Sequence, residues 1–198
     1  MNGRGGRFAC PFFVEGKVGL LQVEAAAAAP VTVYQAKDHV GVHSSETEWD
    51  ALLLGFIQAA TAHAELYLNK ALGAQEWRLT LDGFADEITL PLGPVTAVAA
   101  ITYLDTDRAE QTLDVGSYIL DLVSVPQRIV RDPDASWPDT ADVPNAVTVE
   151  FTTGYASVPA NVTQAILQAV ATWFYNREAG VFPEASLALL RPLRRIVI

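Results

Sequence analysis

The chain has 198 residues, of which 51% are hydrophobic and 18% are charged. This length can bury a substantial hydrophobic core, and the composition is that of a folded protein rather than a disordered one. The formal net charge of -10 argues against a protein that grips nucleic acid over a broad surface, because such a surface must be basic.

The N-terminal stretch and the single cysteine exclude further classes. No uninterrupted apolar run approaches the roughly 18 to 20 residues of a membrane helix, so no membrane partner is expected. A secretory leader is disfavoured because four polar residues break the first apolar stretch: Glu15, Lys17, Gln22 and Glu24. Cys10 stands alone, which excludes an internal disulfide and suits a reducing cytoplasm. Residues 1–30 are interpreted as an N-terminal arm.

The first predicted helix is short and has clear ends. Thr32 and Gln35 have the spacing of a capping box, in which two side chains satisfy backbone N–H groups at a helix start. Gly41 is typical of a helix stop. The pattern predicts a helix from Thr32 to about His39.

A second, longer helix is predicted up to Gly73. Ser45 and Glu48 repeat the capping-box spacing. Behind them, apolar residues recur at intervals of three and four, as on one face of an amphipathic helix. This helix begins with several acidic residues.

From Gln75 the period of the apolar residues changes to two. Trp77, Leu79 and Leu81 alternate with polar residues, and short strand-like segments separated by turns follow. Residues 131–145, RDPDASWPDTADVPN, are predicted to be one long surface excursion because they are rich in Asp and Pro. The pattern predicts a small antiparallel sheet.

After Gly154 the helical period returns, with Pro159 in a position that a helix start tolerates. The predicted fold is α+β, with a three-helix core over residues 31–180 and the sheet inserted between the second and third helices at 75–153. Residues 181–198 follow as a C-terminal arm. The second and third helices should share a core through four aromatic residues: Trp49, Phe56, Trp173 and Phe174.

No constellation of residues predicts catalysis, a metal or a cofactor. His39 and His43 have the spacing of helical metal ligands, but Gly41 should end the helix between them. Residues 131–145 contain four aspartates without the spacing of a calcium loop, and turn formation explains them better: Asp132, Asp134, Asp139 and Asp142. Neither GxSxG nor a paired Cys and His is present. We therefore expect a protein that is not an enzyme.

The C-terminal residues differ from the rest in charge. After Glu184 the only charged residues are Arg191, Arg194 and Arg195, so a basic tail follows an acidic body. Seven large aliphatic side chains there should pack on something, since burial of each gains on the order of 1.5 to 3 kcal/mol: Leu187, Leu189, Leu190, Leu193, Ile196, Val197 and Ile198. Two interpretations stay open, a last strand of the protein's own sheet or an arm that inserts into another subunit.

Several segments, in this order, resemble the head-tail connector or head-completion adaptor family of tailed phages and phage-derived gene transfer agents. They span about residues 30 to 195 and read VTVYQAKDHVGV, ELYLNKALGAQEWRLTLDGF, SWP, NAVTVEFTTGY, VPANVTQAILQAVATWFYNREA and LLRPLR. Residues 1 to about 20 have no counterpart in this resemblance.

The resemblance implies a structural role in a virion or phage-like particle that is assembled in the bacterial cytoplasm. Such adaptors form a ring of about twelve copies that docks under the portal and offers a platform to the next connector or tail component. The family's C-terminal arm engages the portal protein. Carried over to this chain, the portal-binding residues are Leu187, Leu189, Leu190, Arg191, Leu193, Arg194, Arg195, Ile196, Val197 and Ile198.

The acidic composition is compatible with a conduit for DNA. An acidic wall repels phosphates, so DNA should pass through the ring without specific binding. Four acidic residues around the start of the long helix should be exposed near subunit boundaries: Asp38, Glu46, Glu48 and Asp50. The alternative is a monomeric adaptor that offers an acidic surface to one partner.

Overall fold

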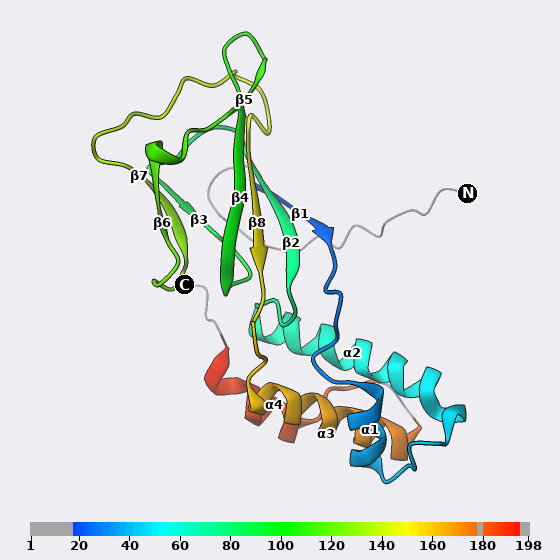
Figure 1. Cartoon of the computed structure of the whole chain (residues 1–198). Coiled ribbons are helices and arrows are strands. Elements are labelled where there is room, and N and C mark those ends of the chain that lie inside the picture. Colours follow the sequence, from blue (N-terminus) through cyan, green and yellow to red (C-terminus); the bar gives the residue numbers. More distant parts are fainter. Residues whose placement is uncertain (1–17, 178–179, 195–198) are drawn as a thin grey trace, which may run out of the picture. The chain divides into compact units, whose positions relative to one another are not determined.

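A computed structural model of the chain describes residues 18–177 and 180–194 (Figure 1). The chain divides into two compact units. The sheet unit consists of Met1–Ala25 and Gln75–Thr153, and the helical unit consists of Ala26–Ala74 and Gly154–Ile198. Each unit has its own hydrophobic core. The predicted α+β class is confirmed.

The helical unit contains four α-helices in the described part of the chain, whereas the sequence predicted a core of three. They are α1 (Val33–Val40), α2 (Asp50–Leu68), α3 (Ala160–Asn176) and α4 (Glu184–Leu190). Two 3-10 turns accompany them, η1 (Thr47–Trp49) and η3 (Arg191–Leu193). The additional helix, α4, packs into the core because Ser186 and Leu190 are both fully buried.

The predicted ends of α1 are confirmed. Thr32 Oγ1 accepts a hydrogen bond from the Gln35 backbone N–H at 3.2 Å, and Gln35 Oε1 accepts one from the Thr32 backbone N–H at 2.9 Å. At the other end Gly41 has φ 72°, a left-handed conformation that glycine adopts without steric cost. Local residues therefore fix both ends of this helix.

The predicted ends of α2 are wrong. The Ser45 hydroxyl lies 2.8 Å from His43 Nδ1, and no side chain caps the helix, which follows η1 directly. The helix ends before Gly73 because Asn69 adopts the left-handed conformation with φ 56°, and the Lys70 N–H donates to the Glu65 carbonyl at 3.2 Å. Asparagine tolerates that conformation better than most residues.

The sheet unit holds two antiparallel sheets. The larger has the order β1-β2-β8-β4-β5, with β1 (Val18–Glu24), β2 (Gln75–Leu81), β8 (Val147–Thr153), β4 (Val95–Leu104) and β5 (Glu110–Thr112). The smaller has the order β3-β7-β6, with β3 (Glu87–Thr89), β7 (Arg128–Arg131) and β6 (Tyr118–Asp121). A 3-10 turn, η2 (Val115–Ser117), precedes β6.

Strand β1 lies within residues 1–30, which the sequence analysis interpreted as an arm. It pairs with β2 at the edge of the larger sheet, starting with Val18 opposite Leu81. Its residues are only half-buried or exposed, so its sequence does not need the alternation of apolar and polar residues that marks a strand. This segment is therefore part of the sheet unit.

The cores follow the predicted patterns. In β8, Val147, Val149 and Phe151 alternate with less buried residues and are nearly inaccessible.

Residues 132–145 contain no helix or strand, and their Trp137 stacks on Phe84 with ring centres 4.8 Å apart. The indole N–H of Trp137 also donates to the Ala85 carbonyl at 2.9 Å. The surface excursion is thereby anchored to the sheet unit.

The predicted aromatic contact between α2 and α3 is also confirmed. The rings of Trp49 and Phe174 meet edge-on with centres 5.5 Å apart, and Phe56 and Trp173 do so at 6.1 Å. Such edge-to-face pairs add to the energy of burial.

Candidate functional site

Of the four acidic residues predicted at subunit boundaries, three are exposed and one has a role within the chain. Asp38, Glu46 and Glu48 are exposed. Asp50 pairs with the ammonium of Lys37, a residue only 4% exposed that also donates to the Ser44 carbonyl at 3.2 Å. Asp50 therefore ties α2 to α1.

The described part of the predicted C-terminal arm is α4 and η3. Leu190 is fully buried in the helical core, and Leu187, Leu189 and Leu193 are partly buried against it. Arg191 and Arg194 are exposed. The last four predicted portal-binding residues lie outside the described residues: Arg195, Ile196, Val197 and Ile198.

Both exposed arginines also make contacts within the helical unit. Arg191 pairs with Glu184 at the start of α4. The guanidinium of Arg194 lies 4.9 Å from the ring centre of Tyr67 on α2, a cation–π contact. Exposed contacts of these kinds are weak and can be exchanged for contacts with a partner.

The exposed residues on the outer face of α2 carry no formal charge, and most of them are apolar or small. This face consists of the exposed residues Ala51, Leu52, Leu54, Gly55, Gln58, Ala62, His63 and Leu66. No residue between Asp50 and Glu65 carries a formal charge. Leu66 is 72% exposed, and Leu52 and Leu54 are each 43% exposed. An apolar face of this kind is typical of an interaction surface.

This face could not be found from the three- and four-residue period, because that period describes only the buried side of a helix. The expectation about membrane helices concerned an uninterrupted apolar run, and a helix with interruptions can still be long and apolar enough by length and composition. Residues Thr47–Leu68 form 22 helical residues that meet both criteria, because uncharged Gln58, Thr61 and His63 interrupt the apolar run without adding charge. A core helix of a globular protein meets the same criteria, and six residues of α2 are buried.

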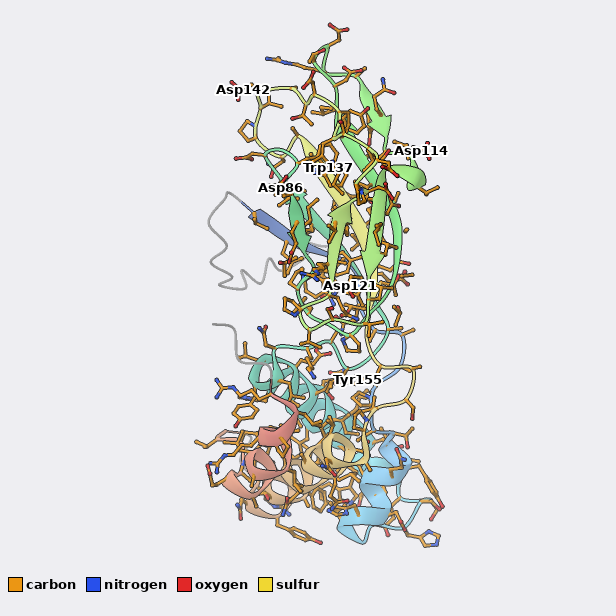
Figure 2. All side chains as sticks on the ribbon, turned by 90° about the vertical axis from the view of Figure 1, so that its left-hand side faces the viewer. Asp86, Asp114, Asp121, Trp137, Asp142 and Tyr155 are labelled. Atoms are coloured by element: carbon orange, nitrogen blue, oxygen red, sulfur yellow. The ribbon has the colours of Figure 1, made fainter. Side chains whose placement is uncertain are left out.

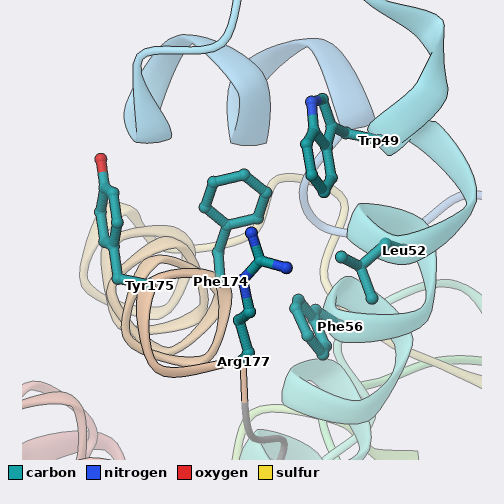
Figure 3. Close-up of a pocket in the computed structure, with 6 residues that line it drawn as sticks. All are labelled: Trp49, Leu52, Phe56, Phe174, Tyr175 and Arg177. Carbon is teal, nitrogen blue, oxygen red and sulfur yellow. The ribbon is translucent and has the colours of Figure 1, made fainter.

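A cleft of about 410 Å³ adjoins this face. Figure 3 shows its lining, in which the guanidinium of Arg177 lies between Phe174 and Phe56; the other lining residues are Trp49, Leu52 and Tyr175. Tyr175 is held in place, since its hydroxyl donates to the Val40 carbonyl at 2.9 Å. Leu52 belongs to both the cleft and the outer face of α2, so the two are continuous.

The excess of acidic over basic residues is confined to one segment. Residues 75–153 contain fourteen Asp and Glu but only four Arg, whereas the remaining residues contain nine acidic and nine basic side chains. The whole net charge of -10 thus belongs to the inserted sheet segment. Figure 2 shows Asp86, Asp114 and Asp142 around Trp137 toward one end of the sheet unit, and Asp121 nearer its other end.

Two of these carboxylates are stabilised in the charged form by hydrogen bonds. Bonds from Ser124 and Arg128 lower the pKa of Asp121 to about 2. The Arg128 Nε atom lies 3.0 Å from Asp121 Oδ2. A bond from the Gln111 side chain, with further bonds from backbone N–H groups, lowers the pKa of Asp105.

The surroundings of the histidines, and of the aspartates in residues 131–145, are those of structural residues rather than of metal ligands. Across residues 18–177 and 180–194, no group of three or more His, Cys, Asp or Glu side chains could hold a metal ion. Asp132 Oδ1 accepts a hydrogen bond from the Asp134 N–H at 2.9 Å, as in a turn. The ring of His63 lies 6.1 Å from Trp173 and 5.8 Å from Phe182, centre to centre.

These features define a class of protein, one that assembles with other macromolecules. An uncharged helix face, an aromatic cleft beside it and a basic C-terminal end are surfaces for assembly with other macromolecules. Comparison with known proteins gives that class a more specific description. The family described as phage gp6-like head-tail connector proteins matches residues 30–117.

Three solved structures of gene transfer agent (GTA) particles contain chains similar to this one. A chain from the neck of an empty particle, computed with C6 symmetry, is 26% identical with a TM-score of 0.73; the match covers 91% of this chain and 97% of that chain. A chain from the neck of a native particle, computed with C12 symmetry, gives the same identity, TM-score and coverage. A chain from the native virion is 27% identical with a TM-score of 0.72, over 90% and 96% of the two chains.

No curated protein matches the chain. The family match and the neck structures are to structural components of virions. The resemblance found in the sequence is confirmed: the chain is similar to structural proteins of the head-tail connector kind.

Proposed function

We propose that this chain is a connector subunit that forms a ring in the neck of a phage-like particle, links capsid to tail and continues the DNA channel. The observation that carries this proposal is its similarity over nearly the full length of chains from necks computed with C6 and C12 symmetry. A closed ring is built from identical subunits that each present two different surfaces to their neighbours. The C12 neck supports a ring of about twelve copies.

We also propose that the C-terminal end contacts the portal protein. Leu190 anchors α4 in the core, and Arg191 and Arg194 are exposed beyond it. Arg195, Ile196, Val197 and Ile198 follow in the sequence. We therefore assign direct contact to the arginines and these last residues, and assign to Leu190 the packing of the helix that carries them.

The charge distribution supports the passage of DNA without specific binding. A segment with fourteen acidic residues and four arginines repels the phosphate backbone. The same charge is the only observation that favours the alternative, a monomeric adaptor with an acidic docking surface. A single copy of the chain in each particle would support that alternative.

The portal contact can be tested by binding to the portal protein of the same particle. The test variant combines Arg191→Ala and Arg194→Ala with removal of residues 195–198, and Arg108→Ala in the sheet unit is the control. We expect the test variant to lose portal binding while its thermal melt stays close to that of the wild type, because all its changes leave Leu190 in place. Retained portal binding would contradict the assignment.

A further inference from the structure

We infer that the outer face of α2 is covered by a second copy of this chain. This inference rests on the proposed ring and assigns one of its two contact surfaces. It is carried by the charge, the exposure and the glycine of this face, and by the cleft that continues it.

The first argument is the lack of charge. Exposed helix faces normally carry Asp, Glu, Lys or Arg, yet none occurs between Asp50 and Glu65. Three leucines project from this face with 43%, 43% and 72% of their surface exposed: Leu52, Leu54 and Leu66. An uncharged face is typical of the centre of a protein–protein interface, where charged residues are depleted.

The second argument is Gly55 in the interior of α2. Glycine weakens a helix interior relative to alanine, so its presence there needs a reason. Nothing among the described residues lies within 4 Å of the position that a Cβ atom would occupy. No contact within the described chain requires glycine here, whereas close approach by another backbone would. Ala51 and Ala62 are exposed on the same face and are also small.

A second copy of this chain is the occupant that the proposed ring and the charges favour. A ring needs two different surfaces on each copy. The outer face of α2 leads through Leu52 into the cleft with Arg177, and none of the described residues that line this cleft is acidic. Asp38, Glu46 and Glu48 are exposed, and they take part in none of the ion pairs of the described residues. Carboxylates of this kind on a neighbouring copy have the charge that complements Arg177.

Photo-crosslinking in assembled particles tests the occupant directly. Gln58, at the middle of the face, is replaced by p-benzoyl-phenylalanine in the full chain, and Thr106 in the sheet unit is replaced in the same way as a control. After irradiation we expect an adduct of two copies of this chain from position 58, with peptides of no other protein. An adduct with another particle protein, an adduct with lipid, or no adduct at all would overturn the inference.

A second pair of variants tests the same face without crosslinking. Gly55→Leu places a large side chain where the neighbour should approach, and Gly116→Leu makes the identical change at an exposed glycine of the sheet unit. Because the space above Gly55 is open, we expect the isolated Gly55→Leu protein to keep its helical circular dichroism but to be lost from particles. The Gly116→Leu protein should be incorporated like the wild type. Normal incorporation of Gly55→Leu would contradict the inference.

The proposed ring and the assignment of α2 to a subunit contact can be disproved separately. If the wild-type chain is absent from particles, or is present as a single copy, the proposed ring is wrong. If the chain is present in many copies but position 58 does not crosslink to another copy, the ring stands and only the assignment of α2 is wrong.

Discussion

The Lys37–Asp50 pair shows how a single contact can hold two elements together. Lys37 is almost completely buried, whereas the side chain of Asp50 is 42% exposed. Removing the carboxylate leaves a buried ammonium whose one remaining partner among the described residues is the Ser44 carbonyl, but removing the ammonium leaves a carboxylate that water can reach. The two substitutions should therefore have unequal effects.

We predict that Asp50→Ala lowers the free energy of unfolding by about 3 kcal/mol, and that Lys37→Met lowers it by no more than about 1 kcal/mol. Urea denaturation of the isolated protein measures both values. If Asp50 acted only between subunits, its replacement would leave the isolated protein unchanged.

Asp121 gives the sheet unit a defined dependence on pH. Its pKa in the folded protein is about 2, below the ordinary value of 3.8, because the folded state donates hydrogen bonds to the charged carboxylate. A lowered pKa stabilises the folded state above the unfolded pKa, and this stabilisation is lost as the pH falls from about 4 to about 2.

We predict that Asp121→Asn lowers the melting temperature at pH 6, and that the difference from the wild type shrinks between about pH 4 and pH 2. Thermal melts across this range measure the effect, with Asp86→Asn as the control. A difference that is constant with pH would show that the hydrogen bonds do not favour the charged form.

At the scale of elements, the two capping-box patterns offer a matched comparison. Both have the same spacing in the sequence, but only Thr32 and Gln35 make the reciprocal hydrogen bonds. We predict that Thr32→Ala lowers the free energy of unfolding by about 1 kcal/mol, and that Ser45→Ala changes it by less than about 0.5 kcal/mol. Equal effects in chemical denaturation would mean that the caps do not distinguish the two helices.

The contrast between these helices explains what the sequence could predict. The ends of α1 are set by Thr32, Gln35 and Gly41, which lie within nine positions of one another. The sequence pattern was therefore sufficient to predict them. The start of α2 has no side-chain cap and follows a 3-10 turn, and its end lies at Asn69 in the left-handed conformation. Neither feature is visible in the period of the apolar residues. The strands were predicted near their observed positions, but their division into two sheets depends on long-range pairing.

The interaction surfaces were less predictable than the fold. The unusual C-terminal composition was evident, but the burial of Leu190 was not, because a short apolar helix reads the same whether it packs on its own core or on a partner. The outer face of α2 could have been found by asking where a long helix lacks charge, rather than where it is apolar.

At the scale of the whole molecule, the chain separates two chemical roles. The sheet unit contains the acidic segment, and the helical unit contains the uncharged face of α2, the aromatic cleft and the basic residues of its C-terminal end. This division fits a subunit that makes its lasting contacts through one unit and presents a surface that repels DNA with the other.

The central claim is that many copies of this chain form a ring in the neck of a particle. Electron microscopy of purified particles, with the chain carrying a density label, tests it most directly. The account predicts a closed ring of labels between capsid and tail, about twelve copies by subunit counting. A label elsewhere on the particle, a single copy at the neck, or particles without the chain would contradict it.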